Sequence, residues 1–218
     1  MLMCTLRIPV LFAQTLRASA LLACALAVPA SHAYVVAITP GVKSIYLQVG
    51  AGTITGGTFS AGGIPGNNAI INRVSVTVPA ASVGTGTVAM TTDSTVTASP
   101  YDGFTYCTIP SQLYIGGFFR TPGASANATL TVSSPAALVN AGGDTIPFNQ
   151  VSWISGGNSE AVGTTIASGT FVGGAAQTLL SVTRNTWFES CLRFNYANSQ
   201  FVAAGTFTGR VSYTLTAP

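Results

Sequence analysis

Residues 186–218 carry the pattern that most restricts the fold of this chain. From residue 205 to residue 216, apolar and polar side chains alternate, and the polar row is mostly Thr and Ser. The apolar row consists of Phe207, Val211, Tyr213 and Leu215. Because side chains of a β-strand point alternately to opposite faces, this pattern predicts a strand with one buried and one solvated face. A second apolar row precedes it and consists of Leu192, Phe194 and Tyr196. We therefore expect the two strands to form an antiparallel hairpin that closes a sheet.

Short runs of β-forming residues also recur along the rest of the chain, and helix patterns are almost absent after residue 33. Gly, Pro, Asn and Ser separate these runs, most densely in residues 50–68. The runs that we interpret as strands are residues 44–49, 71–78, 86–92, 105–109, 113–119, 128–133, 145–155, 169–172, 177–182, 188–195 and 205–216. Their length and spacing predict an all-β fold, an immunoglobulin-like antiparallel β-sandwich.

Residues 1–33 have the features of a secretory signal peptide: Arg7 and Arg17 supply positive charge, an apolar run follows, and Ser31-His32-Ala33 forms a small-x-small cleavage site. A lipoprotein signal is the alternative, because residues 21–24 read Leu-Leu-Ala-Cys, although Arg17 leaves only a short apolar region before Cys24. We expect residues 34–218 to be the exported part, one sizeable domain or two small ones, secreted through the periplasm to the cell surface. Residues 34–68 are either an N-terminal extension with a Gly-rich loop or part of the main domain, and no later stretch is long enough for a transmembrane helix.

The four cysteines divide into two pairs by position. Cys4 and Cys24 fall in the predicted signal peptide, which leaves Cys107 and Cys191 in the exported part. An even number of cysteines in an oxidising compartment predicts one disulfide between them. The alternative is two free, buried thiols.

The exported part lacks the residues on which most catalytic sites depend. The one histidine of the sequence, His32, lies in the predicted signal peptide, so the exported part has no imidazole, and Lys43 is its only lysine. This excludes Ser-His-Asp and Cys-His mechanisms and the commonest zinc ligand sets. Charge is sparse and nearly balanced after residue 33, with six basic and five acidic residues, so nothing indicates nucleic-acid binding. We expect a protein that is not an enzyme and that has no cofactor and no metal site.

Two functions that need neither histidine nor a free cysteine stay open for the exported part. A carboxylate-based hydrolase would have to use two of the five acidic residues as acid and base; these residues are Asp93, Asp102, Asp144, Glu160 and Glu189. A monomeric carbohydrate-binding or adhesin module would use exposed aromatic side chains as stacking platforms. The candidates are Trp153, Trp187, Tyr101, Tyr106 and Tyr114, for which core packing is the alternative.

The C-terminal strand resembles the end of chaperone–usher pilin subunits. Those subunits carry a Gly fourteen residues from the C-terminus, followed by a strand of alternating apolar residues with which a chaperone strand can pair. Gly205 holds that place here, and Val211, Tyr213 and Leu215 occupy the alternating positions. An exported, Thr- and Gly-rich β-sandwich with few charges and one disulfide also looks like such a pilin. The chain departs from the pattern in having Ala217 where pilins have an aromatic residue, in the positions of its cysteines, and in its greater length.

The resemblance implies a fimbrial subunit that polymerises by strand donation, in which an extended segment of one copy completes the incomplete sandwich of the next. Its partners would be further copies of the same chain, a periplasmic chaperone and an outer-membrane usher. The natural donor is residues 34–42, where Val36 and Ile38 are two apart and Pro40-Gly41 ends the strand. The alternative is an ordinary first strand or a frayed terminus.

Overall fold

The computed structural model describes residues 35–157 and 165–218, and these residues are almost entirely in strands and loops. By its contacts the region Ala33–Pro218 forms one compact unit. The predicted signal peptide, with Cys4 and Cys24, lies outside the described residues, as does Glu160. All strand pairs are antiparallel, so the predicted all-β antiparallel class is confirmed.

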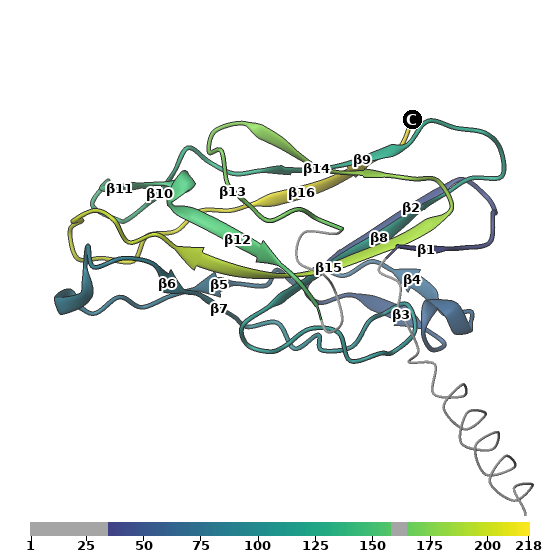
Figure 1. Ribbon diagram of the computed structural model, residues 1–218, viewed down its shortest axis with the longest axis horizontal. Coiled ribbons are helices and arrows are strands. Elements are labelled where there is room, and N and C mark those ends of the chain that lie inside the picture. Colours follow the sequence, from purple (N-terminus) through teal and green to yellow (C-terminus); the bar gives the residue numbers. More distant parts are fainter. Residues whose placement is uncertain (1–34, 158–164) are drawn as a thin grey trace, which may run out of the picture. The chain divides into compact units, whose positions relative to one another are not determined.

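The larger sheet is built around β15 (Thr186–Tyr196), the longest strand (Figure 1). One edge of β15 pairs first with β8 (Leu113–Arg120) and then with β6 (Val88–Ala89). Its other edge pairs first with β1 (Val35–Ala37) and then with β12 (Val151–Ser155). The sheet ends at β13 (Gly169–Thr170) beyond β12, and at β2 (Ser44–Val49) beyond β8. β15 is therefore the one strand that joins all parts of this sheet.

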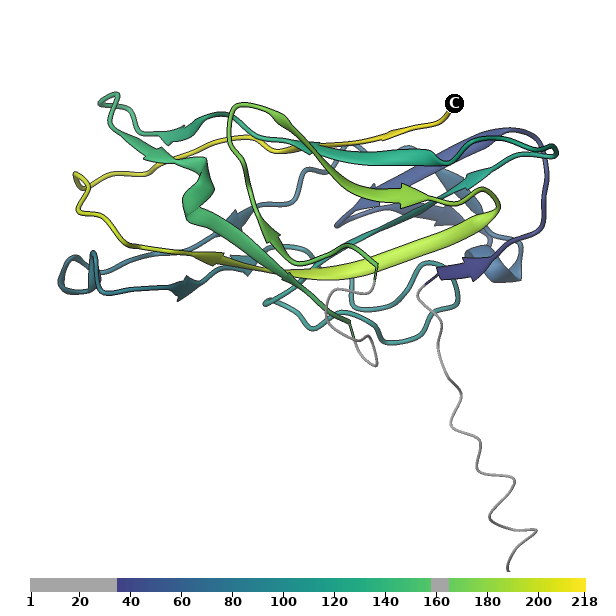
Figure 2. The same ribbon diagram turned by 45° about the horizontal axis from the view of Figure 1, so that its top comes forward.

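A second, three-stranded sheet has the order β14–β9–β16. Its strands are β14 (Ala176–Val182), β9 (Ala128–Ser133) and β16 (Ser212–Thr216). Figures 1 and 2 show this sheet on one side of the larger sheet, with β16 running to the C-terminus. The smaller elements are β3 (Thr53–Thr55) with β4 (Ile64–Gly66), β5 (Val74–Ser75) with β7 (Thr91–Thr92), β10 (Ala137–Val139) with β11 (Thr145–Pro147), and the 3-10 turns η1 (Phe59–Ala61), η2 (Ala80–Ser82) and η3 (Phe148–Gln150).

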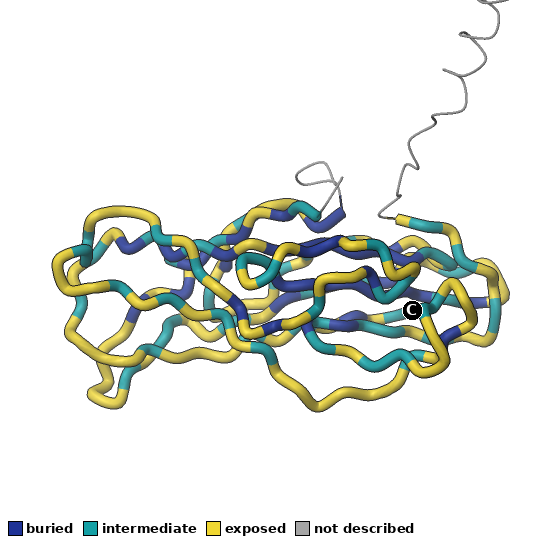
Figure 3. The backbone as a smooth tube through the Cα atoms, turned by 90° about the horizontal axis from the view of Figure 1, so that it is seen from below, coloured by how far each residue is buried: buried dark blue, intermediate teal, exposed yellow. Residues whose placement is uncertain are grey.

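The main core lies between the two sheets. The larger sheet contributes apolar side chains of one parity from β8 and β15, namely Leu113, Ile115, Phe119, Phe188, Leu192 and Phe194. The smaller sheet contributes Leu130, Val132, Val182 and Leu215. Figure 3 shows these buried strands at the centre and exposed loops around them. The two-residue period of the sequence therefore produced two apolar faces, and burying them together accounts for the layered arrangement.

The other face of the larger sheet, which we call the outer face, is also buried. Residues of the opposite parity on β8 and β15 point to it, including Tyr114, Phe118, Trp187 and Glu189. Residues 50–66 and 94–107, which we call the covering segment, pack over this face through Phe59, Tyr101 and Tyr106. The disulfide joins Cys107 of this segment to Cys191 of β15 with a Cα–Cα distance of 5.6 Å, which confirms the predicted bond.

Several predicted elements differ from the observed ones. The expected hairpin of the last two strands is wrong, because β15 lies in the larger sheet and β16 pairs with β9 in the smaller one. β15 is buried on both faces and so needs layers on both sides, whereas β16 has one solvated face and fits an outer sheet. The immunoglobulin-like topology stays a prediction.

Other segments that were predicted as continuous strands are shorter or divided. The segment 71–78 contains the two-residue strand β5, and the segment 86–92 divides into β6 and β7. Residues 105–107 of the segment 105–109 belong to the covering segment, where the N–H groups of Tyr106 and Cys107 both donate to the Thr97 carbonyl. The segment 145–155 divides into β11, η3 and β12, because Pro147 lacks an N–H for the ladder and Phe148 turns into the core. Residues 50–68 were expected to be a plain loop and contain the β3–β4 hairpin.

We predict that the disulfide accounts for much of the stability, because it closes a loop with a sequence separation of 84. Replacing both cysteines, Cys107→Ala with Cys191→Ala, is expected to lower the free energy of unfolding by about 4–5 kcal/mol in the loop-entropy model. Urea denaturation of the variant and of the parent measures the difference. The parent treated with dithiothreitol is the control and should match the variant; a variant as stable as the oxidised parent would contradict the prediction.

Candidate functional site

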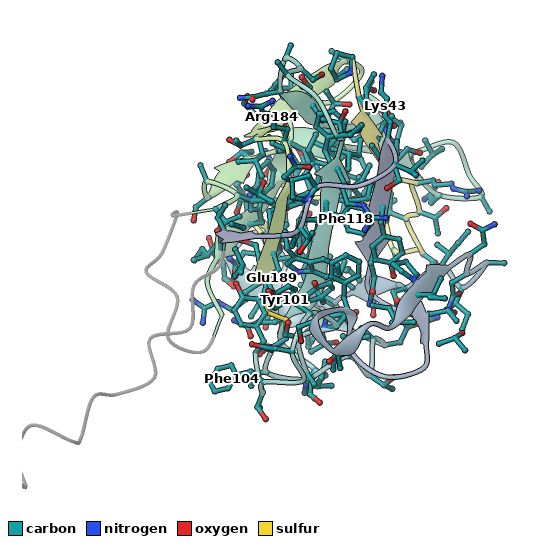
Figure 4. All side chains as sticks on the ribbon, turned by 90° about the vertical axis from the view of Figure 1, so that its right-hand side faces the viewer. Lys43, Tyr101, Phe104, Phe118, Arg184 and Glu189 are labelled. Atoms are coloured by element: carbon teal, nitrogen blue, oxygen red, sulfur yellow. A yellow bond between two sulfur atoms is a disulfide. The ribbon has the colours of Figure 1, made fainter. Side chains whose placement is uncertain are left out.

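Two strands with open edges lie beside each other on one side of the molecule. β2 is the last strand of the larger sheet and β16 the last of the smaller one, and each pairs with one neighbour only within the described residues. The two strands are in contact, and the Lys43 ammonium, just before β2, donates to the Pro218 oxygen just after β16. Figure 4 shows Lys43 beside the C-terminal strand. β2 and β16 thus run in opposite directions with no ladder of hydrogen bonds joining them in the described chain.

A groove with both apolar and polar lining residues follows the open edge of β2. Its volume is about 490 Å³, and its lining includes Ile45, Leu47 and Val49 of β2, Ile70, and Tyr213 of β16. Ile45 is 47% exposed and Ile70 is 62% exposed, although both are large apolar side chains. The lining also includes the polar side chains of Gln48, Asn67 and Asn68, together with Gly66 of the β3–β4 hairpin. Open backbone edges next to exposed apolar side chains are the features that β-proteins normally cover, because they promote pairing with another chain. We call this feature the edge groove.

The structure brings together three of the four predicted C-terminal residues. Leu215 is buried in the main core, and Val211 and Tyr213 are half-buried against it. Ser212, Thr214 and Thr216 of β16 are exposed, as the alternation predicts. Gly205 is separate from this row: it lies in the exposed loop before β16, near Asn140. The apolar row of the predicted zipper is therefore the inward face of β16.

The predicted donor segment pairs with the chain's own β15. Val36 lies opposite Trp187, and the Ile38 N–H donates to the Asn185 carbonyl at 2.9 Å. Val36 and Ile38 point to the same side, toward the outer face, and both are half-buried. The paired strand β1 has only three residues, so few hydrogen bonds hold it. Its role as a donor stays a prediction.

A buried carboxylate organises the outer face. The Oε2 atom of Glu189 accepts hydrogen bonds from Ser99 Oγ at 2.8 Å, Tyr114 Oη at 2.8 Å and Trp187 Nε1 at 3.1 Å. Burial raises the pKa of Glu189, and the three hydrogen bonds oppose that rise. Tyr106 Oη donates to the Glu189 backbone carbonyl at 3.1 Å. Figure 4 shows Glu189 close to Tyr101 and to the disulfide. Glu189 therefore ties the covering segment, through Ser99 and Tyr106, to the central strand.

Gly116 makes the space for this network. It lies directly opposite Glu189 on β8, and a Cβ atom there would lie 2.1 Å from Tyr114 Oη. Any side chain at this position would displace the Tyr114 hydroxyl from the carboxylate. Nothing in the sequence alone indicated this role, because Gly116 stands next to Gly117 within an apolar run.

Four of the five aromatic residues proposed as sugar platforms are buried. Trp153, Trp187, Tyr106 and Tyr114 are each at most 3% exposed, and Trp153 Nε1 donates to the Ala167 carbonyl. These four side chains pack in the interior, so no ligand can stack on them in this structure. Tyr101 is half-exposed and remains available at the surface.

The other described carboxylates hold turns. Asp93 accepts from Asn72 Nδ2 and the Arg73 N–H, and these hydrogen bonds lower its pKa. Asp102 accepts from the Phe104 N–H, and Asp144 accepts from Asn140 Nδ2. Within residues 35–157 and 165–218, no group of three or more His, Cys, Asp or Glu side chains is placed to hold a metal ion. No helix in that part of the chain is long and apolar enough to cross a membrane.

Comparison with protein-family models, with curated proteins and with solved structures found no match to this chain. The resemblance to chaperone–usher pilins therefore stays a prediction. The edge groove was missed by reasoning from the sequence. The signal was present in the alternation of Ile45, Leu47 and Val49 along β2, but the sequence does not show that β2 would be an edge strand.

We predict that removing the Glu189 carboxylate destabilises the fold. Glu189→Leu leaves the donors of Ser99, Tyr114 and Trp187 without their acceptor, and each such buried donor costs about 1–3 kcal/mol. The free energy of unfolding, from urea denaturation, should fall by about 3 kcal/mol or more. Glu189→Gln keeps one acceptor oxygen and is the matched control with a smaller loss. Equal stability of Glu189→Leu and the parent would contradict this role.

The raised pKa of Glu189 also predicts a pH dependence. In the unfolded chain Glu189 loses its proton near its ordinary pKa of 4.5, whereas in the folded chain the pKa is higher. The stability that this group contributes is therefore fully present below pH 4.5 and is lost as the pH rises through the raised pKa. Glu189→Gln cannot ionise, so its free energy of unfolding relative to the parent should increase over the same interval.

Urea denaturation at a series of pH values measures this difference. Ser99→Ala removes a hydrogen bond that lowers the pKa of Glu189, so this second variant should strengthen the pH dependence. A constant difference between Glu189→Gln and the parent at all pH values would show that the carboxyl group titrates normally.

Proposed function

We propose that this chain is a secreted structural subunit of a bacterial surface filament, which assembles by β-strand complementation between identical copies. The observation that carries the proposal is the edge groove, where β2 and β16, each with one strand partner in the described residues, lie in contact beside exposed Ile45 and Ile70. A strand entering this groove would pair with backbone groups that have no partner strand and would cover apolar side chains. In the three-stranded sheet β16 pairs only with β9 within the described residues, which fits the incomplete sandwich that the resemblance to pilins implies.

The donor in this proposal is the segment 34–42 of a second copy. Val36 and Ile38 are two residues apart and therefore point to the same side of an extended strand, so they can enter the groove while the backbone pairs with β2 or β16. In the single chain this segment is held by the short strand β1, and exchanging a weakly held strand between identical copies costs little. Removal of residues 1–33, as the sequence predicts, would leave β1 as a terminal strand free to exchange.

The geometry of exchange explains why the product would be a filament. The donor segment leaves from the β15 side of the larger sheet, and the edge groove follows β2, at a different edge of that sheet. Donor and acceptor surfaces are therefore different, which makes the contact head-to-tail and lets it repeat without closing. The sparse charge of the chain also favours close packing between copies.

The same geometry supports the predicted partners. A subunit with an uncovered groove is prone to pair with the wrong chain before assembly, because open strand edges and exposed apolar side chains lie together. A periplasmic chaperone that inserts a strand along β16 would cover the groove, and an outer-membrane usher would exchange that strand for the donor segment. Val211, Tyr213 and Leu215 are the residues that such a strand would follow.

We predict that a disulfide can join Val36→Cys of one copy to Ile45→Cys of another. Within one chain β1 and β2 are separated by β15 and β8, so the two positions are about 14 Å apart and cannot be bridged. Mixing the two variants, each with one added cysteine besides the Cys107–Cys191 pair, under oxidising conditions should give a crosslinked dimer on a non-reducing gel. The chain with both substitutions should give a ladder of covalent oligomers.

The matched control is Val36→Cys mixed with Ile154→Cys. Ile154 is a similarly exposed strand isoleucine, 37% exposed, but it lies on β12 and away from the edge groove. This mixture should give no crosslink. We expect the parent chain to form filaments that are visible by negative-stain electron microscopy. Deleting residues 34–42 should abolish these filaments and leave a folded subunit. Filaments unaffected by the deletion, or equal crosslinking at Ile45 and Ile154, would disprove the proposal.

A further inference from the structure

A second hollow lies on the outer face of the larger sheet, on the far side of β4 from the edge groove. Its volume is about 420 Å³, within the range of small-molecule sites, about 300–1,000 Å³. Its walls include Ile38 after β1, Phe59 of η1, Tyr101 of the covering segment, and Phe118 and Arg120 of β8. We propose that this outer-face pocket binds an acidic sugar, with the sugar ring against Phe59 and Tyr101 and its carboxylate on Arg120.

The aromatic side chains form a base and an open wall. Phe118 is 4% exposed and lines the pocket, and the fully buried Trp187 packs beneath it and Phe59, whereas Phe59 and Tyr101 are partly exposed. The ring of Phe59 is 4.9 Å from that of Phe118, 5.0 Å from that of Trp187 and 6.3 Å from that of Tyr101. The faces of aromatic rings carry partial negative charge, and the C–H groups of a pyranose carry partial positive charge. Two partly exposed rings at the mouth of a hollow therefore favour a sugar ring over a purely polar ligand.

The positions of these two rings are fixed by the backbone. The Phe59 N–H donates to the Pro100 carbonyl at 3.0 Å, and the Ser60 N–H donates to the Tyr101 carbonyl at 2.8 Å. The turn that carries Phe59 is closed by Gly63, where an added Cβ would lie 2.3 Å from the Gly57 carbonyl oxygen. The two loops are therefore held together before any ligand arrives, which lowers the entropic cost of binding.

Arg120 supplies the one charge in the lining of this pocket. Its Nε atom is buried without a hydrogen-bond partner, and its Cζ atom lies 5.8 Å from the centre of the Phe118 ring. The side chain packs against Gly41, where an added Cβ would lie 3.2 Å from Cζ. No Asp or Glu is among the residues that line the pocket. A guanidinium pairs best with a carboxylate, through two parallel charge-assisted hydrogen bonds. A neutral sugar would leave this charge unpaired, which is why we assign an acidic one.

The lining of the outer-face pocket contains no residue of β2 or β16, but it includes Ala37, Ile38 and Thr39 of the proposed donor segment. The pocket is therefore formed in the single chain, with β1 paired to its own β15, and sugar binding is tested on that form. Failure of assembly leaves this pocket unchanged, and failure of sugar binding leaves the edge groove unchanged, because the two linings share no residue.

Isothermal titration calorimetry of the purified full chain tests the assignment. The probe is the dimer of galacturonic acid, compared with the neutral dimer of galactose and with sodium acetate at the same ionic strength. We expect the acidic dimer to bind at least tenfold more tightly than either. Arg120→Gln should weaken its binding about tenfold or more, because a charge-assisted bidentate contact is lost. Tyr101→Ala should weaken binding of the acidic dimer as well.

The matched control is Arg193→Gln, which removes the same charge from an exposed position on β15 outside the pocket and should leave binding unchanged. Arg120→Lys keeps the charge but cannot form the bidentate contact with a carboxylate, so its affinity for the acidic dimer should fall between those of the parent and Arg120→Gln. The melting temperature of each variant shows that it is folded. Equal binding of acidic and neutral dimers, equal binding of acetate, no binding of the acidic dimer, or full affinity in folded Arg120→Gln would each overturn the proposal.

Discussion

The structure depends on the burial of β15 on both of its faces. The side of β15 with Phe188 and Leu192 packs in the main core, and the side with Trp187, Glu189 and Cys191 would face water if the two sheets were the whole protein. An exposed indole ring would lose the free energy that burial of its apolar surface provides. The covering segment packs over that side of β15 and buries it. The covering segment is attached by the Cys107–Cys191 disulfide and by the hydrogen bonds of Ser99 and Tyr106 to Glu189.

Both candidate binding surfaces follow from this third layer. The β3–β4 hairpin belongs to the covering segment, and its last strand contributes Ile64 and Pro65 to the outer-face pocket and Gly66 to the edge groove. The edge groove exists because β2 ends one sheet and β16 ends the other, with no strand between them. The outer-face pocket exists because the covering segment leaves the end of β8 open at Arg120. One hairpin therefore separates a surface suited to another copy of the chain from a surface suited to a small acidic ligand.

Buried polar groups hold this layer in one register. Glu189 gathers three donors from three separate parts of the chain, and it does so only because Gly116 leaves room for the Tyr114 hydroxyl. A hydrophobic residue at position 189 would give comparable burial but would remove the directional side-chain contacts, so the disulfide and the Tyr106 hydrogen bond would be left to position the covering segment. The same carboxylate links stability to pH, since its pKa is raised by the burial that the layer imposes.

Local pattern was enough to identify the all-β class, the disulfide and many of the strands. β2 and β9 begin and end where alternation predicts, because side-chain parity and turn residues are local properties of the sequence. The same pattern could not assign β16 to the sheet of β9 rather than to a hairpin with β15, since both pairings bury the same apolar row. The sequence favoured core packing for Trp153, Trp187, Tyr106 and Tyr114, and their burial confirms it, but the pattern could not identify Gly116 and Arg120 as parts of sites. Sheet assignment, open edges and pockets depend on contacts between residues far apart in the chain, and only the tertiary structure decides these.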